Sequence, residues 1–277
     1  MRLVNERARQ RGRISLLRPD PERGCDIEIL RSNIECCAGL TGAVVIIDVL
    51  RSFTTAAYAF AAKARAIYPA ETIAKARALR AGLPGALTMG AAPGGTPIPD
   101  FDLSNCPSAL VGRDLSGYDI IHCTGAGVRG IVAARSADAL FAASLVCARA
   151  TAHALRRLAP DTLTLVVTGD WSDRDGDEDH ACADYLEALL RGSEADSGPF
   201  SSRVRASDFG RRYGDPRFPH LPASDLACCA EADRWNFAMR VGTLDGRLVI
   251  RPFGRDAAPA PNAPARPDQP GNLPPEK

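Results

Sequence analysis

The stretch from Ala43 to Thr55, AVVIIDVLRSFTT, constrains the fold of this chain more than any other. Its first five residues are small or β-branched and apolar, which is typical of a strand buried on both faces of a sheet. Asp48 ends this run, and a helix is predicted to follow as far as Lys63. In open α/β sheets, ligands bind where strands hand over to helices, so Asp48 stands where chemistry is expected.

Two interpretations of Asp48 and the residues after it stay open. In the first, Asp48, Arg51 and the nearby hydroxyls, Thr54 among them, together hold a cation and an anionic group at a helix N-terminus. In the second, Asp48 caps the helix and pairs with Arg51, while the hydroxyls satisfy backbone groups. The first interpretation makes this stretch a ligand site, and the second makes it a structural cap.

Strand and helix patterns alternate along most of the chain. Strands are predicted at 65–68, 118–123, 139–142 and 162–168, and helices at 71–80, 128–135, 145–158 and 178–191. Near the end, Phe237–Val241 and Arg247–Pro252 flank an Asp-Gly turn, which indicates a hairpin. The predicted fold is therefore a layered α/β/α sheet with a C-terminal β-hairpin.

A single α/β domain is expected over residues 24–255. Residues 1–23 are polar and basic, and we expect a flexible basic arm there. Residues 256–277 are rich in proline and alanine without an apolar set to bury, and we expect a disordered tail.

Composition narrows the classes of partner. The 34 Lys and Arg residues nearly balance 33 Asp and Glu residues, so neither a nucleic-acid nor a membrane surface is indicated. No apolar run approaches the roughly 20 residues that a spanning helix needs. The nine cysteines form no CxxC pair, which argues against a structural zinc site and fits a cytoplasmic protein. Small anionic substrates are compatible with this charge balance. A homo-oligomer is also compatible with the sequence.

Polar groups follow three predicted strands. Asp48 follows the first, Thr124 with the turn Gly125-Ala126-Gly127 follows another, and Thr168 precedes an acidic turn that leads to Glu178 and Asp179. Strand ends at one edge of a sheet converge, so these groups are predicted to share a crevice. The glycine turn could present amides to a phosphate, although glycines also end strands for steric reasons alone. Glu178 and Asp179 could bind Mg²⁺ or could simply be first-turn charges.

Five segments in order resemble the 2-phosphosulfolactate phosphatase family. They are IDVLRSFTT at 47–55, GGTPIPDFDLSNCP at 94–107, TGAGVRG at 124–130, GDEDHACADYLEALL at 176–190 and DRWNFAMRV at 233–241. Their order and spacing match the family over about residues 24–254, nearly all of the predicted domain.

The resemblance implies a Mg²⁺-dependent phosphatase that hydrolyses the phosphate monoester of a 2-hydroxy acid, typified by 2-phospho-3-sulfolactate. It implies catalytic roles for Asp48, Arg51 and Thr124. Substrate binding is implied for Thr54, Asn105, Gly125, Ala126 and Gly127, and Mg²⁺ ligation for Asp48, Asp102, Glu178 and Asp179. Direct attack by water and a transient aspartyl phosphate on Asp48 both fit this scheme.

Some positions depart from the family pattern. A glycine-glutamate pair is typical of the family after the strand near Met89, whereas Gly90 is followed here by Ala91 and Ala92. Asn236 replaces an expected aspartate, and Val128 a common threonine. A second hypothesis is therefore a catalytically weakened relative that binds an anionic metabolite.

Overall fold

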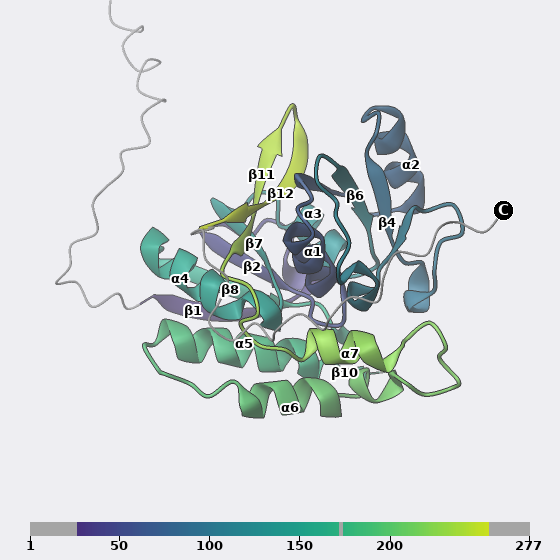
Figure 1. The fold of residues 1–277 in the computed structure, drawn as a ribbon. Helices are drawn as coiled ribbons and strands as arrows, with labels where there is room; N and C mark the ends of the chain where they lie inside the picture. The colour runs from purple at the N-terminus through teal and green to yellow at the C-terminus, as the bar shows by residue number, and fades with distance from the viewer. Residues whose placement is uncertain (1–26, 172–173, 255–277) are drawn as a thin grey trace, which may run out of the picture.

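Ten strands build one mixed sheet in the computed structural model, which describes residues 27–171 and 174–254 (Figure 1). The predicted basic arm and Pro/Ala-rich tail lie outside the described residues. In sheet order the strands are β1 (Glu28–Asn33), β8 (Thr162–Val167), β2 (Ala43–Ile47), β7 (Ala139–Ala143), β11 (Ala238–Leu244), β12 (Arg247–Phe253), β3 (Ala66–Pro69), β6 (Asp119–Cys123), β4 (Leu87–Gly90) and β5 (Leu103–Ser104). A separate two-stranded ribbon pairs β9 (Asp170–Trp171) with β10 (Arg174–Asp175).

The sheet consists of two parallel halves joined by a hairpin. Strands β1, β8, β2 and β7 run parallel to one another, as do β3, β6, β4 and β5. Between them, β11 pairs antiparallel with β7, and β12 pairs antiparallel with both β11 and β3. Three antiparallel pairings in succession give the two halves opposite directions.

Helices cover both faces of the sheet. On one face lie α1 (Ser52–Ala61) and α3 (Gly127–Ala133), packed on alternate strand residues such as Val44 and Ile46. On the other face, α4 (Ala148–Leu158) and α5 (Asp177–Leu190) cover the first half and α2 (Ile73–Ala81) covers the second.

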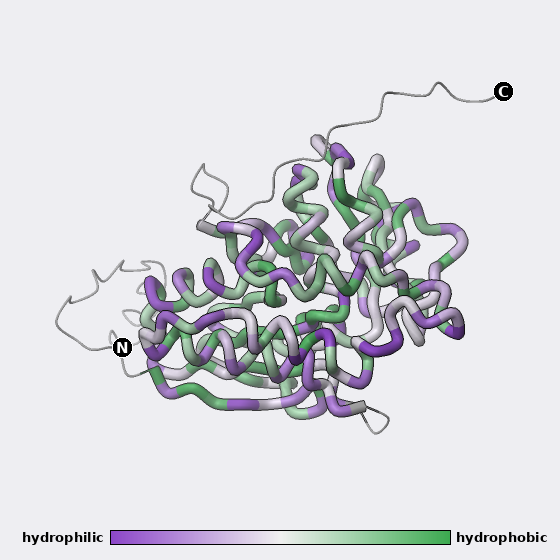
Figure 2. Tube along the Cα trace, turned by 60° about the horizontal axis from the view of Figure 1, so that its bottom comes forward, coloured by the Kyte–Doolittle hydropathy of each residue, from purple (hydrophilic) through white to green (hydrophobic). Residues whose placement is uncertain are grey.

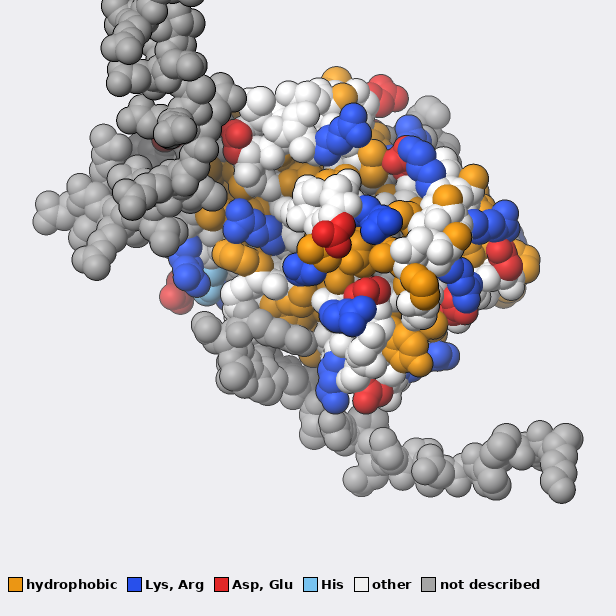
Figure 3. Space-filling view, turned by 90° about the horizontal axis from the view of Figure 1, so that it is seen from above, with side chains coloured by type: hydrophobic (Ala, Val, Ile, Leu, Met, Phe, Trp, Pro, Cys, Tyr) orange, Lys and Arg blue, Asp and Glu red, His pale blue; other side chains and the backbone are white. Residues whose placement is uncertain are grey.

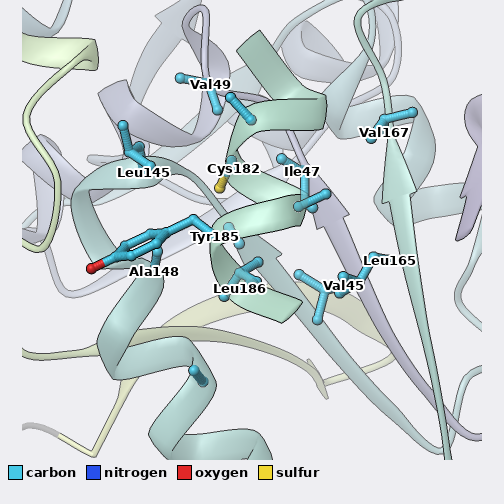
Figure 4. Close-up of a cluster of buried hydrophobic side chains, with 14 of the residues drawn as sticks. Val45, Ile47, Val49, Leu145, Ala148, Leu165, Val167, Cys182, Tyr185 and Leu186 are labelled. Atoms are coloured by element: carbon cyan, nitrogen blue, oxygen red, sulfur yellow. The ribbon is translucent and has the colours of Figure 1, made fainter. Parts of the chain in front are cut away.

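Figure 4 shows the core under α5. Val45 and Ile47 of β2 and Leu165 and Val167 of β8 point toward Tyr185 and its neighbours in α5. These strand residues alternate with those that face α1, so both faces of β2 are buried, as the apolar run predicts. Outside α5 lies α6 (Gly198–Ala206), where Phe200 packs on Tyr185 with ring centroids 5.0 Å apart. The helices in front in Figure 2 carry both hydrophilic and hydrophobic residues, as expected of helices that bury one side.

Helix α1 lies at the centre of the molecule, between the two halves of the sheet (Figure 1). Nine of its ten residues are buried, including Phe53 and Phe60. Burying a phenylalanine side chain contributes about 1.5 to 3 kcal/mol, so these two rings anchor the helix firmly. Both halves of the sheet contribute residues, such as Val44 and Ile67, to the cluster that contains these rings.

Sheet twist explains how the two halves can meet at one site. Five steps separate β2 from β6 in the sheet order. A twist of about 20° to 25° per step turns the strand direction by roughly 100° to 125° over that distance. A flat sheet with opposed halves would send the ends of β2 and β6 to opposite edges, whereas the twisted sheet turns them toward each other.

The predicted fold class is confirmed, including the C-terminal hairpin. Asp245 and Gly246 link β11 to β12 with positive φ values of 49° and 73°, as a type I′ turn requires. The helix bounds agree with prediction to within a few residues, except that α4 starts at Ala148 after a 3₁₀ turn over Leu145–Cys147. The long segment after β4 is ordered and contributes β5, and neither α6 nor α7 (Ala223–Cys229) was predicted. Among the described residues, no helix is both long and apolar enough to cross a membrane.

Candidate active site

A cavity of 610 Å³ lies where β2, β4 and β6 end. Its walls come from the residues after β2, from the turn after β6, from 91–96 after β4, and from the segment between α6 and α7. Four regions distant in sequence thus meet at one place. The sequence-predicted residues that line the cavity are Asp48, Arg51, Asn105, Thr124, Gly125 and Ala126.

Asp48 joins the two halves of the sheet at this cavity. Its Oδ1 accepts a hydrogen bond from the Ser52 amide at 3.0 Å, and its Oδ2 accepts one from the Gly127 amide at 2.9 Å. The side chain is 7% exposed and lines the cavity. Asp48 therefore accepts the first amide of α1, as the structural interpretation expects, whereas Arg51 forms its ion pair with Asp225. The Asp48 side chain also lines the cavity, so the functional interpretation stays a prediction.

Gly127 has a steric role in this arrangement. A Cβ atom there would stand 2.7 Å from Asp48 Oδ2 and 2.9 Å from Phe53 Cζ. Real side chains do not tolerate such contacts, so any other residue would push the Asp48 carboxylate away. Gly127 therefore allows the turn to approach Asp48 closely. Gly125 in the same turn has no such role, because a Cβ there would meet nothing within 4 Å.

Hydroxyl and amide groups form the wall beside Asp48. The hydroxyl oxygens of Ser52 and Thr124 lie 2.8 Å apart, and both residues line the cavity. Asn105 lines it too, with its Oδ1 3.3 Å from Nε2 of His122. Burial lowers the pKa of His122 to about 3, so this ring is neutral at physiological pH. His122 is a fully buried histidine of β6, and it orients Asn105.

Arg51 lies at the cavity wall but is held by protein groups. Its Nη1 lies 2.6 Å from Oδ2 of Asp225, and its Nη2 donates to the Gly95 carbonyl at 2.8 Å. Arg51 is 5% exposed, and Asp225 is fully buried. The guanidinium thus links the loop after β2 to α7 and to the loop after β4. Arg51 therefore holds the parts of the cavity wall together.

Asp179 and Glu178 lie beneath the cavity and do not line it. Asp179 Oδ1 accepts the Val49 amide at 2.8 Å, and its Oδ2 accepts the amides of Thr168 and Gly169 at 3.0 and 2.8 Å. Burial, with the nearby charges of Glu178 and Asp48, raises the pKa of Asp179 well above its usual value. This carboxyl joins the loops after β2 and β8.

Three other predicted residues stand away from the cavity lining. Gly127, predicted to bind substrate, donates its amide to Asp48 Oδ2 at 2.9 Å instead. The Thr54 hydroxyl is fully buried and donates to the Val49 carbonyl at 2.9 Å. Asp102 accepts from the amide and hydroxyl of Thr88 at 2.8 Å each and pairs with Arg80. The structure therefore does not bring Thr54 or Asp102 to the ligand-facing surface.

Several lining residues were not predicted from the sequence. Arg129, in the TGAGVRG segment, is an exposed cation at the cavity. Arg212 lies over the rings of Phe209 and Phe218, 5.4 and 5.9 Å from their centroids, and all three line the same space. Arg129 follows the glycine turn closely enough to have been a candidate, whereas the Phe209–Leu221 segment carries no local signal.

The carboxylates predicted to bind Mg²⁺ are not arranged as one joint metal site, although Asp48 and Glu178 lie near Asp179. Within 27–171 and 174–254, no group of three or more His, Cys, Asp or Glu side chains is arranged to hold a metal ion. Asp48 alone among the four lines the cavity. Mg²⁺ commonly keeps waters and needs only one or two carboxylates besides a substrate phosphate, so Asp48 fits a shared site of that kind.

The fold and cavity define a layered α/β protein with a carboxylate, hydroxyls and arginines around a small-molecule site, a set suited to a phosphorylated ligand. The family model described as 2-phosphosulpholactate phosphatase matches residues 32–208. The chain belongs to the 2-phosphosulfolactate phosphatase family, a family of phosphoric monoester hydrolases.

Three relatives, each named "Probable 2-phosphosulfolactate phosphatase", align with this chain over most of their own length. The protein from Bacillus subtilis (strain 168) is 29% identical over 198 residues, covering 71% of this chain and 86% of the relative. The Carboxydothermus hydrogenoformans protein is 35% identical over 222 residues, 75% of this chain and 90% of the relative. The protein from Synechococcus sp. (strain RCC307) is 35% identical over 214 residues, 70% of this chain and 87% of the relative.

Proposed function

We propose that this protein is a Mg²⁺-dependent phosphatase that hydrolyses the phosphate monoester of a 2-hydroxy acid such as 2-phosphosulfolactate. One observation carries the proposal: the Asp48 carboxylate, fixed by the Ser52 and Gly127 amides, faces a cavity that Arg129 and Arg212 also line. A fixed carboxylate in one cavity with cationic side chains is what phosphate-ester hydrolysis needs, because its catalysis rests on positioning and charge neutralisation.

The cavity suits a substrate with several anionic groups. Phosphosulfolactate carries phosphate, carboxylate and sulfonate, and the volume of 610 Å³ falls within the about 300 to 1,000 Å³ of small-molecule sites. Arg129 and Arg212 come from separate walls, so each can meet a different anionic group. The hydroxyls of Ser52 and Thr124 can donate to further oxygens.

Asp48 is the proposed protein ligand of Mg²⁺. The amides of Ser52 and Gly127 fix its carboxylate at the cavity lining, where an oxygen ligand for a hard cation such as Mg²⁺ is needed. Mg²⁺, when bound, neutralises charge on the phosphate. Asn105, Ser52 and Thr124 line the same cavity and would orient the substrate, while Phe209 and Phe218 add apolar side chains to its wall.

Two routes to hydrolysis fit this geometry. Either Asp48 attacks phosphorus and a transient aspartyl phosphate is hydrolysed, or water attacks directly in a geometry that Asp48 sets. Acid quenching of a single turnover separates them, because only the first route leaves a trapped aspartyl phosphate on the Asp48 peptide. In ¹⁸O-water both routes label the phosphate, and label in the Asp48 carboxylate would show an acyl phosphate hydrolysed at its carbonyl carbon. Direct attack yields labelled phosphate with no trapped intermediate.

A second candidate function is the binding of an anionic metabolite with little turnover. The observation that favours it is that Ala91 and Ala92, at the position of the family's glycine-glutamate pair, line the cavity. A carboxylate expected there would face the ligand, and its loss can reduce catalysis by orders of magnitude while binding survives.

A panel of phosphate monoesters assayed with added Mg²⁺ and with EDTA tests both candidates. The phosphatase proposal predicts phosphate release that depends on Mg²⁺ and is fastest with phosphorylated 2-hydroxy acids. Calorimetric binding of the same compounds without release would favour the binding protein instead. Equal release with and without Mg²⁺ would contradict the metal dependence.

A further inference from the structure

A second hollow, of 530 Å³, lies at the opposite end of the strands from the active-site cavity. It is lined by residues at the start of β7, including Ala139, and by the β11–β12 hairpin. Ala139 pairs with Ala43, the first residue of β2, whereas Asp48 follows the last. Five residues of strand span about 16 Å, so the two hollows are separate places on the molecule.

Three arginines line this second hollow: Arg135, Arg240 and Arg251. The one acidic residue among its described lining residues is Asp138, whose Oδ2 already accepts the Gly42 amide at 2.8 Å. Over the part of the chain that the structure describes, no carboxylate forms an ion pair with any of the three guanidinium groups. The hollow therefore carries concentrated positive charge.

The placement of two of these arginines is unfavourable without a counter-charge. Arg240 and Arg251 are directly opposite each other in the β11–β12 ladder, so both side chains project from the same face. Like charges in that position repel each other and destabilise the pairing of the strands. A bound anion would convert this repulsion into attraction.

The surroundings of the arginine pair suit a small ligand. The ring of Phe253 lies under the Arg240 guanidinium, with 5.2 Å from Cζ to the centroid, and packs against Phe141. Val249 on the other side belongs to the cluster under α2. The arginine pair thus lies between two hydrophobic clusters, on an aromatic support that holds one guanidinium in place. Figure 3, which looks onto the end of the molecule where the hairpin projects, shows Lys and Arg side chains, with Asp and Glu between them, beside hydrophobic ones.

We infer that this hollow, the arginine groove, is a second anion site, distinct from the active-site cavity, that takes a small anion with two or more phosphate or carboxylate groups. Arginine suits such groups because its planar fork donates two parallel hydrogen bonds to their oxygens. Three guanidinium groups around 530 Å³ call for more than one anionic group on the ligand.

Calorimetric titration with pyrophosphate at low ionic strength tests the inference, using Arg240→Gln/Arg251→Gln and, as a control, Arg247→Gln. Arg247 lies on the same hairpin but lines a different hollow beside α2. The double variant is expected to weaken pyrophosphate binding at the groove at least 10-fold, and Arg247→Gln to leave it within twofold. Citrate in place of pyrophosphate distinguishes a carboxylate site from a phosphate site.

Binding in the active-site cavity is separated by repeating the titrations with Arg129→Gln. We call Arg240→Gln/Arg251→Gln the groove variant. If the two sites are independent, its loss of pyrophosphate affinity should be the same with and without Arg129→Gln. Without anion, the groove variant should unfold at an equal or higher temperature than the unchanged protein, because repulsion is relieved. In the Arg129→Gln background the double change should also remove the stabilisation that pyrophosphate gives. Arg251→Gln alone serves if the double variant does not fold. Unchanged pyrophosphate binding in the folded groove variant would overturn the inference.

Discussion

The guanidinium of Arg51 lies 2.6 Å from the carboxylate of Asp225, and the two side chains are 5% and 0% exposed. Asp225 also accepts the amide and hydroxyl of Ser108 at 3.0 and 2.7 Å. One buried ion pair thus joins the loop after β2, the segment after β5 and helix α7. Because Arg51 also holds Gly95, this pair fixes much of the cavity wall.

Asp225→Asn is expected to destabilise the protein by about 3 to 5 kcal/mol, since it leaves a buried guanidinium without its counter-charge. KM should rise as the wall near Gly95 loosens. Urea denaturation and steady-state kinetics measure the two effects. Asp215→Asn is the control. Asp215 pairs with the exposed Arg217, so this substitution should lower the free energy of unfolding by less than about 1 kcal/mol. Equal effects of the two variants would contradict the structural role of Asp225.

Gly127→Ala is expected to displace the Asp48 carboxylate, because the added Cβ would stand 2.7 Å from Oδ2. Overpacking of this kind costs about 1 to 3 kcal/mol, and kcat should fall as well. Thermal unfolding and phosphate release measure these losses. The matched control is Gly125→Ala in the same turn, where the added Cβ meets nothing within 4 Å. Loss of kcat in the control but not in Gly127→Ala would refute the steric account.

His122 makes stability depend on pH. Burial lowers its pKa from 6.5 to about 3 in the folded protein, so the unfolded chain binds the proton more readily. The stabilisation of the folded state that this pKa difference gives is complete above pH 6.5. It is lost as the pH falls toward 3, at up to about 1.4 kcal/mol per pH unit. His122→Gln should flatten the decline of unfolding free energy between pH 6.5 and 4. The exposed His153→Gln should leave it unchanged, and an identical decline in His122→Gln would argue against a buried neutral ring.

Ala91→Glu tests whether a missing carboxylate limits turnover. Ala91 is 8% exposed and lines the cavity, so a glutamate there can reach the ligand. We expect kcat to increase by at least tenfold if the site lacks a metal ligand or general base, since such a group contributes about 10²- to 10⁴-fold. Ala92→Glu, one residue along, is the positional control. No gain, or an equal gain in both variants, would reject the idea that Ala91 marks a lost catalytic group.

Local sequence patterns predicted the elements that position Asp48. The apolar run Ala43–Ile47 is a buried strand because its residues face α1 on one side and α5 on the other. The turn after β6 was also placed correctly, since glycines and an apolar strand mark it locally. The shared crevice was predicted for the wrong reason, however, because β2 and β6 belong to halves that run in opposite directions.

Other parts of the site depend on contacts between distant residues. Ser52 lines the cavity, but Thr54, two residues further along α1, points in another direction because of the helical turn. Its hydroxyl donates to the Val49 carbonyl instead. Arg51 is bound by Asp225, 174 residues away, and that same pairing brings the segment with Arg212 to the cavity. Patterns of neighbouring residues carry no information on such pairings, so these roles became visible only in the folded chain.

The most direct test of the proposed activity is phosphate release from 2-phosphosulfolactate with Mg²⁺, comparing the unchanged protein with Asp48→Asn and Asp102→Asn. Asp48 faces the cavity and Asp102 does not, although the sequence made both candidates for Mg²⁺. We predict that Asp48→Asn lowers kcat at least about 100-fold, as loss of a group acting on the reacting atoms does, while Asp102→Asn stays within twofold. Unchanged turnover in a folded Asp48→Asn variant would contradict the proposed site.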